Sequence, residues 1–228
     1  GGMAVLYMVA TPIGNMDDIT LRAIETLRTV ELILCEDTRH SRRLLQHHGI
    51  QTPVAAWHAY SRSGEARRII ERIGQIGSAA CISDAGTPGI SDPGTKLVRR
   101  ARQAGYTVVP IPGPSAPAAL FSVGGIPGKG YVFEGFLSPK QGRRRKALGQ
   151  LIAAARPFIL FESPHRIVKL LADLAEHIPE GEITIGRELT KRFEEVWSGT
   201  CEQAYRTFSS RKKQQGEFTV LVNPAKTG

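Results

Sequence analysis

Short apolar runs alternate with segments of helical periodicity along the first half of the chain. Uninterrupted apolar runs, which predict buried parallel strands, occupy residues 5–10, 31–35, 79–83 and 107–111. Apolar residues at intervals of three or four predict amphipathic helices over 19–30, 69–76 and 97–104. Asp17 and Asp18 precede the first of these helices and are expected to cap it. The alternation predicts an α/β lobe built on a parallel sheet.

The second half resumes the alternation after a change of composition. Residues 124–130 hold four glycines and one proline, which predicts a linker between two domains, 3–123 and 131–228. Beyond the linker, strands are expected at 131–136, 158–161, 183–185, 193–197 and 218–222, and a helix at 165–178. The predicted fold is α/β, with two lobes that each hold a mixed or parallel sheet flanked by helices.

Composition narrows the class of protein. Hydrophobic residues make up 41% of the 228 and charged residues 22%, the balance of a globular chain rather than a disordered one. The 30 Lys and Arg against 21 Asp and Glu leave a net charge of +9, which is typical of polyanion binding and equally of a soluble surface. The charge alone leaves both interpretations open.

The cysteines and the hydropathy of the sequence indicate the cellular compartment of the protein. Cys35, Cys81 and Cys201 lack the spacing of zinc ligands, and their odd number does not suit a disulfide framework, so a reducing compartment and no metal are expected. No window approaches the ~18 apolar residues of a membrane span, and the first residues do not resemble a secretion signal. We therefore expect a cytoplasmic protein.

Four loops rich in Gly, Pro and Asp follow predicted strands. They are residues 11–15, 83–94, 110–116 and 161–166. Ligands of open α/β sheets bind outside the carboxyl ends of the strands, so these loops are candidates for a binding site. Asp84 and Asp92 offer carboxylates for a cationic amine or for ribose hydroxyls. Any one loop alone is explained as a stiff turn with a local Asp cap, but three after consecutive strands favour a site.

Several nucleotide-binding and hydrolase motifs are absent from the sequence. No G-x-G-x-x-G follows a strand, Gly128-Lys129 lacks the other residues of a P-loop, and no G-x-S-x-G surrounds Ser115. His47 and His48 are adjacent and diverge on a helix, so they are interpreted as surface residues rather than metal ligands.

Seven short strings, in order, resemble one known family. They are VATPIGN (9–15), EDTRH (36–40), SDAGTP (83–88), SDPG (91–94), PGPSA (112–116), Glu162 with PHR (164–166), and RELTK (187–191). Together they resemble the ribosomal RNA small subunit methyltransferase I family, within the tetrapyrrole methylase superfamily. The resemblance runs from about Leu6 to Val222. In one place the chain departs from the family, since His58-Ala-Tyr-Ser-Arg62 stands where a His-x-His-Asn-Glu segment is expected.

The resemblance implies a fold, a reaction and a partner. It implies two α/β domains with S-adenosylmethionine (SAM) in a cleft between the lobes, and a homodimer. The implied reaction is 2′-O-methylation of a cytidine in the decoding centre of 16S rRNA, in the small ribosomal subunit.

The resemblance also implies cofactor contacts. Asp84 is expected to pair with the methionine ammonium of SAM, while Gly86 and Thr87 offer backbone contacts. Ser115 and Ala116 begin a helix whose amide groups suit a carboxylate or a ribose oxygen, and Pro12 closes the same side. From the second lobe, Leu160, Glu162 and Gly216 are expected against the adenosine.

Candidates for catalysis and for RNA contact follow. Methyl transfer depends mainly on holding the 2′-oxygen in line, and a base for its proton, if used, is sought among Glu162, His165 and Lys191. For His165, a capping or packing role at a helix start is an equal alternative. The residues expected to hold phosphates are Arg39, Arg42, Arg43, Arg143, Arg144, Arg145 and Lys146. A solvated face is the alternative for each group, and Arg211-Lys-Lys213 is expected to be an exposed loop.

Three hypotheses follow from the sequence. The first is an rRNA 2′-O-methyltransferase, which the EDTRH string and the adjacent arginines favour. The second is a methyltransferase acting on a tetrapyrrole. The third is a non-catalytic RNA-binding assembly factor that keeps the fold.

Overall fold

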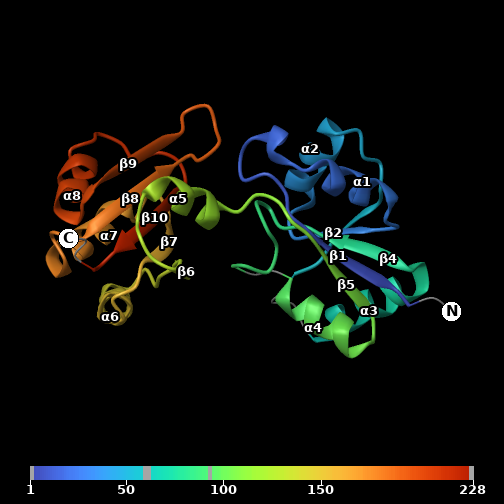
Figure 1. The fold of residues 1–228 in the computed structure, drawn as a ribbon. Helices are drawn as coiled ribbons and strands as arrows, with labels where there is room; N and C mark the ends of the chain where they lie inside the picture. The colour runs from blue at the N-terminus through green and yellow to red at the C-terminus, as the bar shows by residue number, and fades with distance from the viewer. Residues whose placement is uncertain (1–2, 59–62, 92–93, 226–228) are drawn as a thin grey trace. The chain divides into compact units, whose positions relative to one another are not determined.

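The computed structural model describes residues 3–58, 63–91 and 94–225. The chain forms two compact units, Gly1–Ser115 and Ala116–Gly228. Each unit has its own sheet, helices and hydrophobic core (Figure 1). The predicted α/β fold is confirmed.

The first unit is built on a parallel sheet of five strands. The strands are β1 (Val5–Val9), β2 (Ile33–Cys35), β3 (Val54–Ala56), β4 (Ser78–Cys81) and β5 (Thr107–Ile111), in the order β3-β2-β4-β1-β5. All of their pairings are parallel. Four longer helices cover the sheet: α1 (Leu21–Thr29), α2 (Thr38–His47), α3 (Ser63–Ile76) and α4 (Thr95–Gln103).

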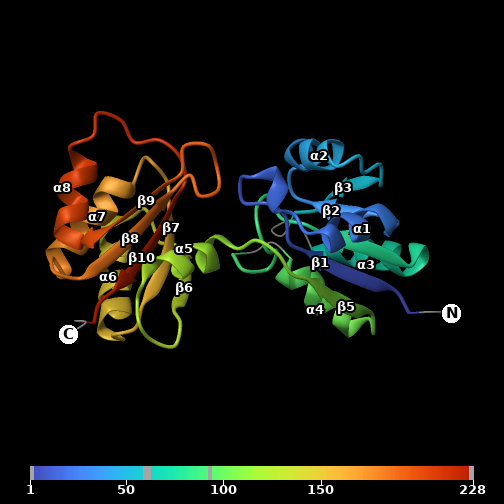
Figure 2. The ribbon, with the colours of Figure 1, turned by 45° about the horizontal axis from the view of Figure 1, so that its top comes forward.

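Alternate residues of each strand supply two core layers in this unit. Ile33 and Cys35 of β2 pack with residues of α1 and α2, whereas Leu34 packs with residues of α3 and α4. Figures 1 and 2 show α1 and α2 on one face of the sheet and α3 and α4 on the other. Both faces are thus covered by helices, as a parallel sheet requires.

The start of α1 differs from the prediction. Asp17 and Asp18 belong to a separate turn of 3-10 helix, η1 (Met16–Asp18), which the Asn15 side chain caps. Thr20 caps α1 instead, because its Oγ1 accepts a hydrogen bond from the Ala23 amide at 2.9 Å. The prediction that the two aspartates cap this helix was therefore wrong.

The second unit has a mixed sheet of five strands. They are β6 (Val132–Phe136), β7 (Phe158–Glu162), β8 (Glu182–Arg187), β9 (Glu195–Thr200) and β10 (Phe218–Asn223), in the order β6-β7-β10-β8-β9. Only the β6–β7 pair is parallel. Residues of α6 (Gln141–Ala153), α7 (Ile167–His177) and α8 (Cys201–Ser209) pack in one core cluster, and α5 (Ala116–Gly124) packs in another.

The division between the units falls before α5, not at the Gly-rich segment. Leu120 of α5 packs with Ile126, Ile159 and Leu221, so this helix belongs to the second core. A Cβ on Gly124 would lie 2.5 Å from Leu221 Cδ2, which shows how closely α5 approaches β10. Residues 124–130, predicted as the linker, instead connect α5 to β6 inside the second unit.

Within residues 3–58, 63–91 and 94–225, no helix combines the length and the apolar character needed to cross a membrane.

A buried ion pair joins two helices of the second unit. Arg144 of α6 is 4% exposed and Asp173 of α7 is 3% exposed. The Arg144 Nε donates to Asp173 Oδ2 at 2.6 Å, and the partly exposed Arg145 donates to Oδ1 at 3.1 Å. Because a charge buried without a partner is costly, this contact ties the orientation of α6 to that of α7.

Loss of the buried guanidinium should destabilise the second unit strongly. We expect Arg144→Met to lower the free energy of unfolding by about 3 kcal/mol, since Asp173 would stay buried with only Arg145 as partner. Arg145→Met, at a more exposed pair, should cost less than about 1 kcal/mol. Urea titrations compared at equal m-values measure both. Equal losses of unfolding free energy in the two variants would show that burial of the ion pair does not determine its contribution to stability.

Candidate active site

Three of the predicted loops meet in the first unit. β1, β4 and β5 are adjacent and parallel, so their carboxyl ends share one edge of the sheet. Thr11 and Gly86 exchange two backbone hydrogen bonds of 3.0 Å, which join the first loop to the second. The Thr87 hydroxyl donates to the Pro114 carbonyl at 2.9 Å and joins the second loop to the third.

Gly86 sits where these loops converge. Its φ of +77° lies in the left-handed region, which side chains rarely adopt. A Cβ there would lie 3.2 Å from Ile13 Cγ2 and 3.4 Å from the Pro114 oxygen. Pro12 follows Thr11 in the sequence and is buried, whereas Thr87 and Ser115 are half-buried. Of the predicted cofactor residues, Pro12, Gly86, Thr87 and Ser115 therefore lie in one connected set of loops.

Asp84 presents a carboxylate at this edge. The residue is exposed, and within the described part of the chain no ion pair engages its side chain. Its backbone carbonyl lies 2.7 Å from His40 Nε2, which donates when that nitrogen carries the proton. Asp92, the second predicted carboxylate, and the segment 59–62 lie outside the described residues.

The EDTRH string has a structural role that sequence reasoning missed. Asp37 caps α2, because its Oδ1 accepts from the amides of Arg39 and His40. Hydrogen bonds from the His40 and Arg39 amides hold the pKa of Asp37 below its ordinary value. The cap fixes the first turn of α2 and, through it, the His40 ring that contacts the Asp84 backbone. An Asp just before a helix was the available signal.

The second unit gathers its predicted residues at one edge of its sheet. Phe218, at the start of β10, pairs with Glu162 at the end of β7 and with Arg187 at the end of β8. The segment before β10 therefore lies between the end of β7, with Glu162, and the end of β8. Leu160 lies two residues before Glu162 on β7, and its side chain is fully buried in the core.

Glu162 is already engaged within its own unit. Its side chain is buried, and Oε1 accepts from the Ser163 amide at 2.8 Å and from Arg166 Nε at 3.2 Å. This carboxylate is therefore engaged by two donors of the residues that follow it, 163–166. Glu162 thus fits a positioning role for the 163–166 turn better than the role of a base.

Lys191 carries a proton that it holds firmly. Its Nζ lies 2.6 Å from Glu188 Oε2 and 3.6 Å from Glu217 Oε2. Burial acts to lower the pKa of Lys191, but the two carboxylates outweigh it and raise the pKa above its ordinary 10.5. At neutral pH this ammonium is a cation and not a base.

His165 is exposed in the turn that precedes α7. Arg166 is the N-cap of that helix and makes no side-chain cap, while the Ser163 carbonyl accepts from the amides of Arg166 and Ile167. Within the described residues, no hydrogen bond engages the His165 ring. The alternative capping role for this histidine is therefore wrong, and its ring is accessible.

The loop after β8 has an unusual backbone. Glu188 and Thr190 have φ of 53° and 71°, values rare outside glycine. Gly216 has φ of +91°, and a side chain there would collide with Glu188. The Glu188 amide donates to the Glu217 carbonyl at 3.0 Å, and Thr190 N donates to Glu194 Oε1 at 2.8 Å. Backbone outliers of this kind concentrate at functional sites.

The residues predicted to hold phosphates divide into two groups. Arg39, Arg42 and Arg43 on α2 are exposed, as are Arg143, Arg145 and Lys146 on α6. Arg144 is not available to a phosphate, because it is buried against Asp173; its assignment as an RNA contact is corrected here. Arg145 is also paired, with Asp173 and with Glu176 at 3.4 Å.

Arg211 corrects the prediction of an exposed basic loop. Its guanidinium makes two 2.8 Å hydrogen bonds to the Glu195 carboxylate and lies over the Phe208 ring at 4.1 Å. Arg187 donates to Glu195 as well, at 3.2 Å. Lys212 and Lys213 are exposed as predicted. Arg211 is thus part of the fold of the second unit.

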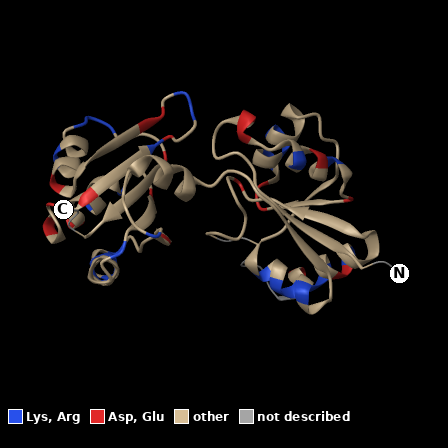
Figure 3. Cartoon of the chain, in the orientation of Figure 1, with Lys and Arg blue, Asp and Glu red and all other residues tan. Residues whose placement is uncertain are grey.

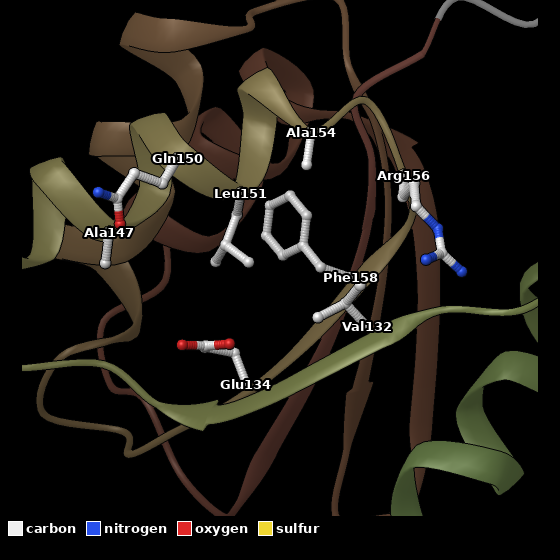
Figure 4. A pocket seen from close by; sticks show the side chains of 8 residues that line it. All are labelled: Val132, Glu134, Ala147, Gln150, Leu151, Ala154, Arg156 and Phe158. Atoms are coloured by element: carbon white, nitrogen blue, oxygen red, sulfur yellow. The ribbon is translucent and has the colours of Figure 1, made fainter.

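A hollow of about 230 Å³ lies between β6 and α6 (Figure 4). Its floor is formed by Val132, Leu151 and Phe158, with Glu134 at one side, and the Arg156 guanidinium is directed away from it. None of the predicted site residues lines this hollow.

Metal and thiol chemistry find little support in the described residues. In the ranges that the structure describes, no three His, Cys, Asp or Glu side chains gather as metal ligands. The three cysteines are buried and form no disulfide in the part of the chain that the structure describes, and burial raises the pKa of Cys201 to about 12. A thiol held neutral in this way is a poor nucleophile.

Comparison with known proteins identifies the family. The sequence model described as "Tetrapyrrole (Corrin/Porphyrin) Methylases" matches residues 5–205. A relative in Synechocystis sp. is 44% identical over 221 residues, covering 96% of this chain and 79% of the relative. One in Xylella fastidiosa is 47% identical over 222 residues, covering 96% and 81%. Both are named "Ribosomal RNA small subunit methyltransferase I".

A solved structure agrees at the level of the fold. The methyltransferase CobJ superposes with a TM-score of 0.72 at 17% identity, covering 100% of this chain and 98% of that one. The chain belongs to the tetrapyrrole methylases and, within them, to the ribosomal RNA small subunit methyltransferase I family. The resemblance inferred from the seven strings is confirmed.

The Glu195 cluster should make stability depend on pH. Hydrogen bonds from Arg211, and next from Arg187, hold the pKa of Glu195 below its ordinary 4.5 despite some burial. Because the pKa of Glu195 is lower in the folded state than in the unfolded state, its ionised carboxylate stabilises the folded protein. This stabilisation is fully present above pH 4.5 and is lost as the pH falls through the folded-state pKa. The difference in unfolding free energy between the parent protein and Glu195→Gln should therefore shrink on acidification.

Urea titrations over a series of pH values measure this difference. Glu202→Gln is the control, since the Glu202–Arg206 pair is exposed and should contribute less than about 1 kcal/mol. A Glu195→Gln deficit that stays constant down to acid pH would contradict the ion-pair origin.

Proposed function

We propose that this chain transfers a methyl group from SAM to the ribosomal RNA of the small subunit, at the 2′-oxygen of a cytidine in the decoding centre. The observation that carries the proposal is the set of loops joined through Thr11, Gly86 and Thr87, at the carboxyl edge of a parallel sheet. Relatives named as small-subunit rRNA methyltransferases, over 96% of the chain, support the choice of acceptor.

The residues at this edge fit the charges of SAM. The exposed carboxylate of Asp84, without an ion pair in the described part of the chain, suits the methionine ammonium. The missing side chain of Gly86 lets the three loops that surround the proposed cofactor approach one another closely. Ser115 and Ala116 stand at the start of the nine-residue α5, where free amides suit a carboxylate or a ribose oxygen.

The second unit supplies the remaining proposed contacts. We assign Glu162, Gly216 and the backbone at Leu160 to the adenosine, and Glu162 acts there through the 163–166 turn that it holds. SAM, when bound, supplies a methyl group activated by a sulfonium. The chain has to orient the ribose hydroxyl toward it, and positioning of this kind contributes most of the acceleration.

Side-chain contacts separate the three candidate bases. Lys191 is a cation paired with Glu188 and Glu217, and Glu162 is held by Arg166. His165, with an accessible ring, is the residue that we assign to the hydroxyl proton. The family membership further supports a homodimer that acts in the cytoplasm.

The SAM assignment can be tested by calorimetry. Asp84→Ala should weaken SAM binding by about 1–3 kcal/mol, roughly 5-fold to 150-fold, which is the size of a lost charge-assisted contact. Glu31→Ala is the matched control, because Glu31 is an exposed carboxylate at the opposite edge of the same sheet, before β2. Unchanged affinity in Asp84→Ala would remove this residue from the site.

The acceptor can be tested by transfer of a labelled methyl group from SAM. Intact small subunits, naked rRNA and a tetrapyrrole precursor are offered in parallel, and label is expected on the first or second. A 2′-O-methyl group blocks alkaline cleavage at its own linkage, so resistance at one cytidine identifies the atom. Label on the tetrapyrrole alone would replace the proposed acceptor, and no transfer at all would favour a non-catalytic assembly factor.

A further inference from the structure

Two neighbouring helices of the first unit carry a dense set of cations. α3 and α4 pack side by side over one face of the sheet, where Ala66, Ile73, Leu97 and Ala101 are buried. Their outward residues include seven cations: Arg67, Arg68, Arg72, Lys96, Arg99, Arg100 and Arg102. In Figure 3 the ribbon of these two helices is coloured blue over much of its length, the colour of Lys and Arg positions. We call this surface the α3–α4 face.

The charge of the α3–α4 face is almost unopposed. The acids of the two helices are Glu65 and Glu71, so the face accounts for five of the net nine positive charges. Glu71 pairs with Arg67 at 3.3 Å on the exposed surface. Within the described residues, no ion pair engages the other six cations.

The basic helix of the second unit differs in this respect. On α6, Arg144 and Arg145 are held by Asp173, and Arg145 also by Glu176. Two of the three arginines of α6 thus serve the fold, whereas six of the seven cations of the α3–α4 face have no ion-pair partner among the described residues. Helix polarity explains only part of the pattern. Arg100 and Arg102 lie in the last turn of α4, which favours cations, but Lys96 lies in its first turn, which does not.

The position of the two helices relates this charge to the candidate site. α4 begins at Thr95, directly after the loop that carries Asp84, and runs away from that edge of the sheet. Positions 96, 99 and 102 recur every three residues along it and span about 9 Å at 1.5 Å per residue. The cations therefore extend from the edge that holds the site loops along the outer surface of the same unit.

We propose that the α3–α4 face binds the phosphate backbone of the RNA that the enzyme methylates. The inference rests on the proposed function and names the surface that holds its acceptor. Guanidinium and ammonium groups spaced along a helix pair are the usual partners of successive phosphates. The face would bind RNA without reading its sequence, since phosphate contacts position a nucleic acid and base contacts specify it.

The same face does not suit a membrane surface. Helices that lie in a lipid interface insert large apolar side chains beside their cations. The exposed large hydrophobic residues of the described chain are Met3, Leu21, Ile90, Val123, Phe136, Phe193, Val196 and Tyr205. None belongs to α3 or α4, whose apolar residues face the core.

Salt-dependent binding tests the proposal. Arg99→Gln with Arg102→Gln removes two charges from the face, and Lys212→Gln with Lys213→Gln removes two exposed charges from the second unit as a matched control. Binding to small subunits and to naked rRNA is measured between about 50 and 200 mM salt. The first pair should weaken binding roughly tenfold and reduce the slope of log K against log salt by about two, and the control by less than half of that.

Further measurements separate a binding role from a structural one. The affinity for SAM and the melting temperature should match the parent protein in both double variants, and Arg99→Lys with Arg102→Lys should restore most of the salt slope. If the parent protein methylates rRNA and both Gln variants behave alike, the α3–α4 face is not the RNA surface and the proposed function stands. If the parent protein neither binds nor methylates rRNA, the proposed function itself fails. Preference for vesicles of anionic phospholipid over RNA would overturn the assignment to RNA.

Discussion

The parallel pairing of β1 with β4 and β5 is the constraint on which the first unit depends. It brings three strand ends, separated by up to a hundred residues of sequence, to one edge of the sheet. The Thr11–Gly86 bridge and the Thr87–Pro114 bond then join the loops that leave those ends. These joined loops place Asp84 at the surface, where no ion pair engages its carboxylate within the described residues.

Much of the parallel sheet of the first unit could be predicted, because buried parallel strands are continuous apolar runs in the sequence. Residues 5–9 and 107–111 were predicted as strands from this pattern, and they form β1 and β5. β3 escaped prediction because its small, partly exposed residues lack the run of large apolar side chains that marks β2. α8 escaped because its start depends on the reciprocal Thr200–Gln203 capping box rather than on an apolar stripe. The association of α5 with the second core was equally invisible, since Leu120 meets Ile159 and Leu221 only in three dimensions.

Charge was the least predictable property of the site. The sequence shows where arginines stand but not which acids reach them, and Asp173 lies 29 residues from Arg144. From the sequence alone Lys191 was a reasonable candidate base, but in the structure Glu188 and Glu217 pair with its ammonium group. Conversely, residues 97–104 were predicted as a helix from their apolar face, and the structure shows no ion pair to the cations of α4 within the described residues. Long-range pairing therefore decides which cations belong to the fold and which remain for a ligand.

The place of β10 between β7 and β8 has a consequence for biosynthesis. β7 and β8 do not pair with each other, and every residue of β10 is buried between them. During translation the first unit has all of its strands once Ile111 has emerged, and it can fold as domains commonly do, from the N-terminus onward. The second sheet stays divided until residues 218–223 are made. Through that interval β7 and β8 expose unpaired edges, which makes the nascent second unit the part of the chain most in need of chaperones.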